Sequence, residues 1–216
     1  CIERLVRLAE KHRLIIYSDE IYDKILYDGV KHISPASLTE DTLVVTLSGL
    51  SKSHRMAGFR TGWMVLSGNR QMAEDYIEGL QLLASMRLCS NVPSQFAICS
   101  ALDGYQCIND LVKPGGRLYQ QRETAWRLLN EIPDVSCTKP QGAFYLFPRL
   151  DMERFGLKDD KQFALDLLQA KRILIVQGTG FNWFQPDHFR LVALMEPEGL
   201  AKAIADIGDF LSTYHQ

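Results

Sequence analysis

The stretch "TLVVTLSGLSKSHRMAGFRTGWMVLS", residues 42–67, decides the fold class of this chain. It opens with a largely apolar run without alternation, which is typical of a strand buried on both faces, as in a parallel sheet. Its last part, residues 62–67, indicates the same less strongly. Between them lies a loop of small and hydroxyl residues that holds Lys52 and, framed by glycines, Arg60. The pattern indicates a layered sheet whose connecting loop presents one amine and two guanidinium groups, Arg55 and Arg60.

The sequence on either side continues this alternation of helices and strands. Apolar residues recur at helical spacing in residues 2–13, and residues 14–17 form another unbroken apolar run. Downstream, residues 68–104 have helical patterns, and Pro93 suits the first turn of the second helix. The segment "KPGG" at 113–116 interrupts the pattern before one further long helix. Helices and strands in this order predict an α/β protein.

The last third of the chain predicts a second, smaller set of strands and helices. Strands are expected within residues 142–147, 172–178 and 188–195, with a helix around residues 163–168. A closing helix is predicted from an apolar stripe at helical spacing: Leu200, Ile204, Ile207 and Leu211. The change of pattern indicates a second domain with its own core.

Composition and charge exclude several classes of function. The 216 residues are 46% hydrophobic and 23% charged, which predicts a globular protein with a substantial core. The net charge is -2, and basic and acidic residues are interspersed along the sequence. The sequence therefore lacks the cluster of basic residues that would predict binding to nucleic acid or to an anionic membrane. The five cysteines are scattered and form no CxxC pair, so we expect no disulfide framework, no metal site and a reducing cytoplasmic setting. No apolar run is long enough to span a membrane.

Two polar residues follow neighbouring predicted strands. Asp19 comes just after the apolar run at 14–17, and Lys52 comes just after the run at 42–49. In doubly wound sheets, ligands bind beyond the carboxyl ends of the strands. We therefore expect Asp19 and Lys52 to lie at the same edge of one sheet.

The residue types at this edge suit pyridoxal 5′-phosphate (PLP). A deprotonated lysine amine forms a Schiff base, and a carboxylate such as Asp19 keeps a pyridine nitrogen protonated. Arg60 has the planar fork that binds phosphate, and Ser48 and Ser51 are hydroxyl donors to phosphate oxygens. The loop also contains glycines that allow a backbone to approach a ligand closely: Gly49, Gly58 and Gly62. Each residue alone is more often an ordinary surface or turn residue, and their combination favours the cofactor site.

Four segments in order resemble a known family. They are "SDEIYD" at 18–23, "SGLSKSHRMAGFRTGW" at 48–63, "QGAFYLF" at 141–147 and "HFRLVAL" at 188–194. Together they resemble the C-terminal half of the class I aminotransferases, which have fold type I of the PLP enzymes. Within that family the chain is most similar to bacterial glutamate–pyruvate (alanine) aminotransferases, through the stretches "QGTGFNW" and "KPGGRLYQQR".

The resemblance implies a fold and a setting for the whole protein. Residues 1–106 would be the C-terminal part of the large, mixed-sheet α/β domain that binds PLP. Residues 107–216 would be the small C-terminal α/β domain with its long connecting helix. The chain starts at Cys1, already inside an amphipathic pattern, so we expect it to be a piece of a longer protein whose N-terminal half completes the cofactor pocket. We also expect a cytoplasmic homodimer.

The resemblance assigns roles to individual residues. Lys52 would bond covalently to PLP, Asp19 would pair with the pyridinium nitrogen, and Tyr22 would hydrogen-bond the ring oxygen. Arg60 would hold the phosphate with help from Ser48 or Ser51. These two serines stay as alternatives, because some members have a serine three positions before the lysine, where this chain has glycine. In the second domain, Arg190 would bind the substrate α-carboxylate as a two-point pair.

The implied reaction is ping-pong transfer of an amino group between an L-amino acid and a 2-oxo acid. Alanine and glutamate, with pyruvate and 2-oxoglutarate, are the expected substrates, and alanine biosynthesis is the expected process. Lys52 would be the general base at the α-carbon. A PLP-dependent β-lyase would use the same lysine, aspartate and arginine. A PLP-binding regulatory domain fused to a DNA-binding segment and a non-catalytic remnant are further alternatives.

Overall fold

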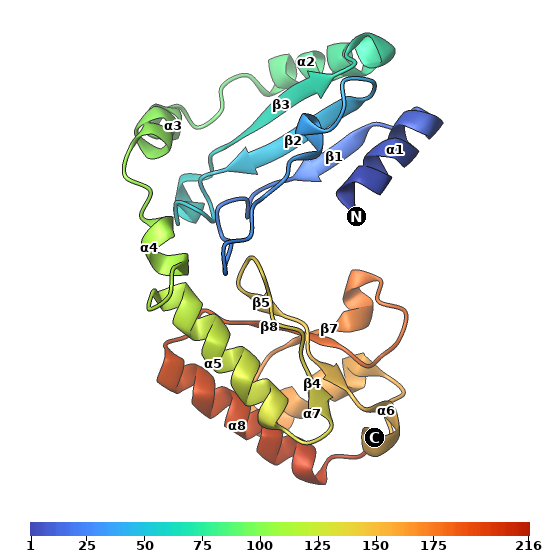
Figure 1. Ribbon diagram of the computed structural model, residues 1–216, viewed down its shortest axis with the longest axis vertical. Coiled ribbons are helices and arrows are strands. Elements are labelled where there is room, and N and C mark those ends of the chain that lie inside the picture. Colours follow the sequence, from blue (N-terminus) through green and yellow to red (C-terminus); the bar gives the residue numbers. More distant parts are fainter. The chain divides into compact units, whose positions relative to one another are not determined.

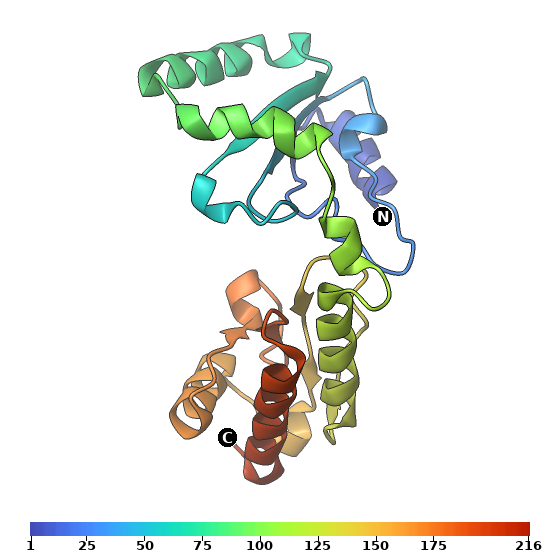
Figure 2. The ribbon, with the colours of Figure 1, turned by 90° about the vertical axis from the view of Figure 1, so that its left-hand side faces the viewer.

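The computed structural model describes residues 1–216, which form two compact units (Figures 1 and 2). The first unit consists of residues 1–26 and 30–109, and the second of residues 27–29 and 110–216. The chain therefore passes into the second unit for a short turn, returns, and enters it again for its last half. Each unit has secondary structure of its own and is described by itself below.

The first unit is built on a three-stranded sheet with the order β1-β2-β3. Its strands are β1 (Ile16–Asp19), β2 (Leu43–Gly49) and β3 (Gly62–Gly68). β1 runs parallel to β2, while β3 runs antiparallel to it. Ile77 of α2 packs against Leu43 and Val45 of β2, so α2 covers one face of the central strand. The α/β class and the mixed sheet expected from the sequence are confirmed.

The helices of the first unit begin and end close to the expected positions. α1 ends before Arg13, which has left-handed backbone geometry, and Pro93 lies in the first turn of α3 as predicted. The longer elements are α1 (Ile2–His12), α2 (Glu74–Arg87) and α3 (Val92–Asp103), and the short α4 (Ile108–Val112) spans the boundary to the second unit. The short 3-10 turns are η1 (Pro35–Ser37), η2 (Ala57–Phe59) and η3 (Gln71–Ala73).

Two expectations about the strands were wrong. The apolar run at 14–17 does not coincide with a strand buried on both faces, because β1 begins at Ile16 and Tyr17 is 54% exposed. The stretch 62–67 does form a strand, but β3 is an antiparallel edge strand, and Met64 and Val65 are about half exposed. An edge strand has a neighbour on one side only, so an apolar run does not guarantee burial.

The second unit packs its longer helices and short strands around one core. α5 (Arg117–Glu131) and α8 (Pro197–Thr213) lie side by side (Figures 1 and 2). The other helical elements are α6 (Met152–Phe155), α7 (Asp160–Lys171) and the 3-10 turn η4 (Gly178–Phe181). The strands are β4 (Val135–Ser136), β5 (Tyr145–Leu146), β6 (Arg149–Leu150), β7 (Val176–Gln177) and β8 (Phe189–Val192).

The strands of the second unit form two small antiparallel sheets, β4-β6 and β5-β8-β7. β5, β7 and β8 are shorter than the apolar runs that predicted them but lie inside the predicted ranges, whereas β4 and β6 were not predicted. The predicted stripe of α8 is confirmed, since each of its members is at most 2% exposed: Leu200, Ile204, Ile207 and Leu211. The break at 113–116 also separates α4 from α5 as expected.

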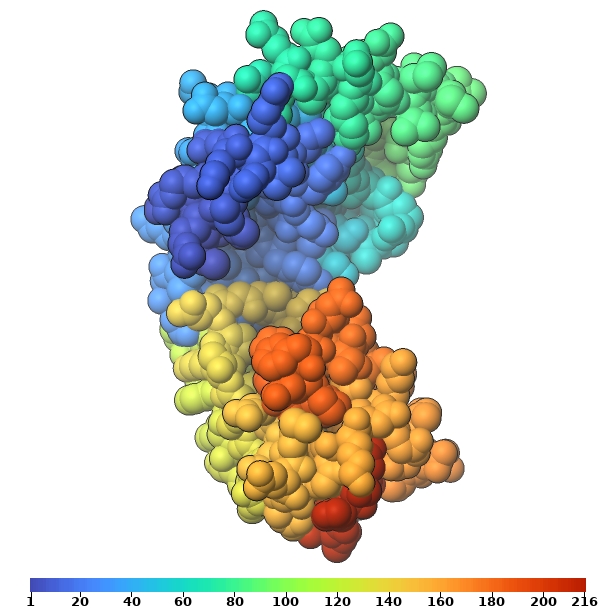
Figure 3. All heavy atoms as spheres, turned by 90° about the vertical axis from the view of Figure 1, so that its right-hand side faces the viewer, coloured from blue at the N-terminus to red at the C-terminus, as the bar shows by residue number.

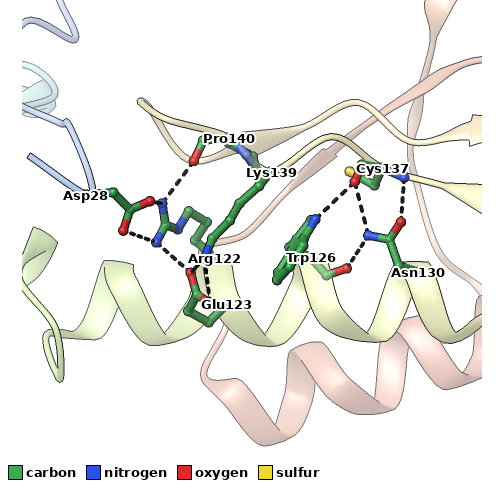
Figure 4. A network of polar contacts seen from close by, with 8 residues as sticks. All are labelled: Asp28, Arg122, Glu123, Trp126, Asn130, Cys137, Lys139 and Pro140. Atoms are coloured by element: carbon green, nitrogen blue, oxygen red, sulfur yellow. Dashed lines mark hydrogen bonds and ion pairs between the residues drawn. The ribbon is translucent and has the colours of Figure 1, made fainter. Parts of the chain in front are cut away.

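A buried arginine ties the turn at 27–29 to the second unit (Figure 4). Arg122, on α5 and 1% exposed, donates to both carboxylate oxygens of Asp28 and to the carbonyl of Pro140. Its guanidinium also lies 4.3 Å from the ring centroid of Tyr27. The Tyr27 hydroxyl donates to the carbonyl of Ala143 at 2.8 Å. Burial raises the pKa of Tyr27 to about 12, so this hydroxyl stays protonated.

No helix of the structure is long and apolar enough to cross a membrane. No group of three or more histidine, cysteine, aspartate and glutamate side chains is placed to hold a metal ion. In the space-filling view, the orange segment that contains η4 lies on the surface of the second unit (Figure 3).

Candidate functional site

Asp19 and Lys52 follow neighbouring parallel strands of the first unit. Asp19 is the last residue of β1 and stands opposite Leu47 of β2. Lys52 lies three residues beyond the end of β2. Parallel strands end at the same edge of a sheet, so both side chains belong to the carboxyl edge, where ligands bind in this class of fold. The juxtaposition predicted from the two apolar runs is therefore present.

Tyr22 lies beside the lysine. The Lys52 amine is 6.0 Å from the centroid of the Tyr22 ring, and this amine has no hydrogen bond or ion pair within the chain. The Asp19 carboxylate accepts one hydrogen bond, from the backbone N–H of Ile21 at 3.2 Å. The edge thus presents an amine and a carboxylate that keep most of their bonding capacity for a ligand.

The turn that carries Lys52 is fixed by backbone and side-chain hydrogen bonds. Met56 N–H donates to the carbonyl of Leu50, and Arg55 N–H donates to the carbonyl of Lys52. His54 bridges this turn to α3, because one ring nitrogen contacts the Ser53 hydroxyl and the other the Ala101 carbonyl. His54 therefore has a structural use in this turn.

Arg60 and the two serines lie on the same loop and on β2. Arg60 is exposed, has left-handed backbone geometry (φ 52°), and uses Nη1 to donate to the carbonyl of Ala57 at 2.9 Å. The rest of its guanidinium is available to an anion. Ser48, on β2, and Ser51, in the turn before Lys52, are half-buried and have no side-chain hydrogen bond. Both hydroxyls remain candidates for a phosphate.

Two of the loop glycines serve the sheet itself. Gly49 and Gly62 face one another across β2 and β3, and a Cβ on Gly49 would lie 2.7 Å from the Thr61 carbonyl oxygen. A Cβ on Gly62 would lie 2.8 Å from the Ser48 carbonyl oxygen. These glycines therefore let two strands approach each other, rather than a strand approach a ligand. A serine at position 49 would require β3 to move away.

The sequence analysis missed the role of Glu20, the neighbour of Asp19. Glu20 is 9% exposed and accepts hydrogen bonds from Ser34 Oγ at 2.6 Å and from His32 Nε2 at 2.8 Å. Burial would raise the pKa of this carboxyl, but the hydrogen bonds from Ser34, His32 and Ser18 together lower it. The ionised Glu20 fixes the loop that follows β1, and the sequence shows it only as a second acidic residue next to Asp19.

Arg190 belongs to the second unit, where it lies on β8 opposite Val176 of β7. It is half-buried, and its Nε is buried without a hydrogen-bond partner. The guanidinium carbon lies 4.7 Å from the ring centroid of Phe181 and 4.9 Å from that of Tyr145. The arrangement presents a cation between aromatic neighbours, which suits an incoming carboxylate.

Comparison with known proteins decides the family. The family model of class I and II aminotransferases matches residues 1–207. The chain belongs to this family. It is 55% identical over 212 residues to the glutamate-pyruvate aminotransferase AlaA of Escherichia coli (strain K12), covering 98% of this chain and 52% of that protein. It is 56% identical over 215 residues to an alanine aminotransferase of Mycobacterium tuberculosis, covering 100% of this chain and 50% of that protein.

Solved structures of the family share the fold. A crystal structure of an Escherichia coli aminotransferase superimposes with a TM-score of 0.97 at 54% identity, over 100% of this chain and 53% of that one. An alanine aminotransferase of Pyrococcus furiosus superimposes with a TM-score of 0.90 at 37% identity, over 98% of this chain and 52% of that one. The chain spans about half the length of the relatives it matches.

Class I and II aminotransferases depend on PLP, and the carboxyl edge of the first unit fits this cofactor. An amine without polar partners, Lys52, suits its aldehyde group. The Asp19 carboxylate suits a protonated ring nitrogen, and the free edge of the Arg60 guanidinium suits a phosphate.

Proposed function

We propose that the protein represented by this chain is a PLP-dependent aminotransferase that moves an amino group between an L-amino acid and a 2-oxo acid. The observation that carries the proposal is the placement of Asp19 and Lys52 after adjacent parallel strands, with Tyr22 beside the lysine amine. Family membership and the similarity to glutamate-pyruvate and alanine aminotransferases support it.

In this proposal each residue of the edge has one task. Lys52 bonds the cofactor, Asp19 holds its ring nitrogen protonated, and Tyr22 donates to its ring oxygen. Arg60 binds the phosphate with Ser48 or Ser51 as a second donor. In the second unit, Arg190 binds the α-carboxylate of the substrate. We propose residues 1–106 as the C-terminal part of the large domain and residues 107–216 as the small domain.

The chemistry follows from proton and charge placement. Bound PLP supplies an electron sink for the pair left on the α-carbon. With the cofactor bound, the Lys52 amine would be the base that takes the proton from that carbon. The Asp19 carboxylate would stabilise the positive charge on the cofactor's ring nitrogen. Arg190 binds the carboxylate throughout, so it orients the α-carbon without taking part in proton transfer.

Alanine and glutamate as amino donors, with pyruvate and 2-oxoglutarate as acceptors, are the proposed substrates. They come from the names of the similar proteins, glutamate-pyruvate and alanine aminotransferase. A role in alanine biosynthesis, a homodimeric assembly and a cytoplasmic location complete the proposal. The net charge of -2 gives no sign of a basic surface. This supports small-molecule rather than nucleic-acid partners.

The test is visible absorbance of the full-length protein with and without PLP, beside its Lys52→Ala variant. The parent protein is expected to develop a band that Lys52→Ala lacks, and addition of L-alanine or L-glutamate is expected to bleach it. No band with an intact fold would overturn the proposal. Release of ammonia and pyruvate from a cysteine conjugate, without transfer to 2-oxoglutarate, would instead identify a β-lyase.

A further inference from the structure

The side chain of Arg190 is held by aromatic rings rather than by a carboxylate. Its guanidinium carbon lies 4.7 Å from the Phe181 centroid and 4.9 Å from the Tyr145 centroid, while its Nε has no partner. Rings attract a guanidinium through their negative faces, yet they do not occupy its N–H donors. Aromatic neighbours therefore orient this arginine while its donors remain available to a ligand.

The two rings reach Arg190 in different ways. Tyr145 of β5 stands opposite Val192 of β8. Val192 and Arg190 are two positions apart on β8, so their side chains are on the same face of the sheet. Tyr145 is therefore the diagonal neighbour of Arg190 across the two strands. This ring is fixed by the sheet. Phe181 is the last residue of the short turn η4 and is 46% exposed. Phe181 lies outside the sheet and has one further ring contact, a T-shaped one with Phe147 at 6.4 Å between centroids, so its position depends mainly on what anchors η4.

A buried carboxylate anchors η4. Asp160, the first residue of α7, is 3% exposed. Its two oxygens accept both donors of Thr179, the backbone N–H at 2.8 Å and the hydroxyl at 2.7 Å. Thr179 lies two residues before Phe181 in the same turn. A buried carboxylate with two charge-assisted hydrogen bonds is a strong local constraint.

We propose that Asp160 and Thr179 are positioning residues for carboxylate recognition: they fix η4 so that Phe181 orients the guanidinium of Arg190. The inference rests on the proposed function, since it assumes that Arg190 binds the substrate carboxylate. It assigns to Asp160, Thr179 and Phe181 an effect on substrate affinity and none on proton transfer.

The experiment measures carboxylate binding directly in the full-length, PLP-loaded protein. Calorimetric titration with propanoate, a carboxylate without an amine, reports the Arg190 interaction alone. Phe181→Leu is expected to raise the propanoate Kd about 2- to 5-fold, the usual strength of one cation–π contact. KM for L-alanine should rise by a similar factor, with kcat changed less than about twofold, because the lost interaction is the same in ground and transition states.

Matched variants separate positioning from a general loss of structure. Phe181→Tyr keeps a ring and Thr179→Ser keeps the hydroxyl, so both should bind propanoate like the parent protein, whereas Thr179→Val should behave like Phe181→Leu. Phe184 is 78% exposed, and its ring packs on Trp183 rather than on Arg190. Phe184→Leu therefore serves as a control and should leave the propanoate Kd unchanged.

The outcomes distinguish this inference from the proposed function. If Phe181→Leu and Thr179→Val bind propanoate as tightly as the parent while Arg190→Lys binds at least about 10-fold more weakly, the inference is overturned and the proposed role of Arg190 stands. If Phe181→Tyr loses as much affinity as Phe181→Leu, the ring contact is not the cause, and the inference is again overturned. If Arg190→Lys leaves the Kd unchanged, the role of Arg190 fails, and the inference fails with it.

Discussion

Arg122 and Asp28, 94 positions apart in the sequence, form a two-point ion pair: Nη1 donates to Oδ2 at 2.6 Å and Nη2 donates to Oδ1 at 3.1 Å. The arginine is almost completely buried, whereas the carboxylate side chain is 39% exposed. Arg122 also pairs with Glu123, which Lys139 contacts in turn at 2.8 Å. This network is what attaches the turn at 27–29 to the second unit (Figure 4).

Loss of this arginine should destabilise the protein markedly. Arg122→Met keeps an apolar stem but leaves Asp28 without its cation and Glu123 with Lys139 alone, and we expect a loss of about 3 kcal/mol in the free energy of unfolding. The matched control is Arg127→Met on the same helix, whose pair with Glu131 is exposed and worth at most about 0.5 kcal/mol. Urea unfolding of both variants measures the difference. Equal losses would show that the Arg122 network does not contribute to stability.

The stability of the protein should decrease in acid because of ionised carboxylates with hydrogen-bond donors. Burial raises the pKa of Asp187, but hydrogen bonds from His188, Trp183 and Arg149 lower it overall. The hydrogen bond from Arg122 lowers the pKa of Asp28. A lowered pKa in the folded state means a contribution present above the unfolded pKa of about 4 and lost as pH falls through the folded value.

Thermal unfolding between neutral pH and pH 3 checks this sign. We expect a nearly constant Tm down to about pH 4 and a decrease below it. Asp187→Asn should have a lower Tm at neutral pH, because Asp187 accepts from Trp183 Nε1 at 2.9 Å and from His188 Nδ1 at 2.6 Å. The Tm of this variant should also decrease less than that of the parent protein when the pH is lowered. If the Tm of both proteins decreased by the same amount on acidification, Asp187 would not be the titrating group.

Substitution by alanine should lower the free energy of unfolding at Gly49 and raise it at Gly58. A Cβ at position 49 meets the Thr61 carbonyl oxygen at 2.7 Å, so Gly49→Ala must push β3 away and should cost about 1–3 kcal/mol. At position 58 no atom lies within 4 Å, and Gly58→Ala should stabilise by about 0.4–1 kcal/mol through the unfolded chain. Chemical denaturation measures both. Destabilisation by Gly58→Ala would show that the η2 turn has less space than the structure describes.

Asp19→Asn should lower activity without lowering stability. The carboxylate is exposed and its only hydrogen bond is to the N–H of Ile21, so the free energy of unfolding should change by less than about 0.5 kcal/mol. In the proposed mechanism the negative charge is needed during proton transfer, so kcat for L-alanine with 2-oxoglutarate should fall on the order of 100-fold. The control is Asp41→Asn, an exposed aspartate just before β2 at the opposite end of the strand. Similar effects on kcat from both substitutions would contradict a specific role for Asp19.

The predictions from the sequence succeeded where the signal is local. The stripe of α8, the end of α1, the start of α5 and Pro93 in the first turn of α3 depend on helical spacing and on backbone preferences of single residues. The positions of Asp19 and Lys52 followed because two apolar runs each ended just before a polar residue. The roles of these residues in a cofactor site stay predictions.

Long-range contacts account for what the sequence did not indicate. Nothing in the stretch 62–67 distinguishes an antiparallel edge strand from a buried parallel one, because direction and neighbours depend on the rest of the sheet. Glu20 and Asp160 look like ordinary surface acids until Ser34, His32 and Thr179 surround them. The aromatic neighbours of Arg190 come from segments 45 and 9 positions away in the numbering, Tyr145 and Phe181.

By itself, then, the sequence determined the α/β class, the helices and the edge that carries Asp19 and Lys52, since periodicity and strand ends are properties of neighbouring residues. The tertiary structure alone decided the direction and exposure of β3, the attachment of the turn at 27–29 to the second unit, and the ring contacts of Arg190. Each of these depends on pairs such as Arg122 and Asp28, whose contact exists only once distant segments have packed together.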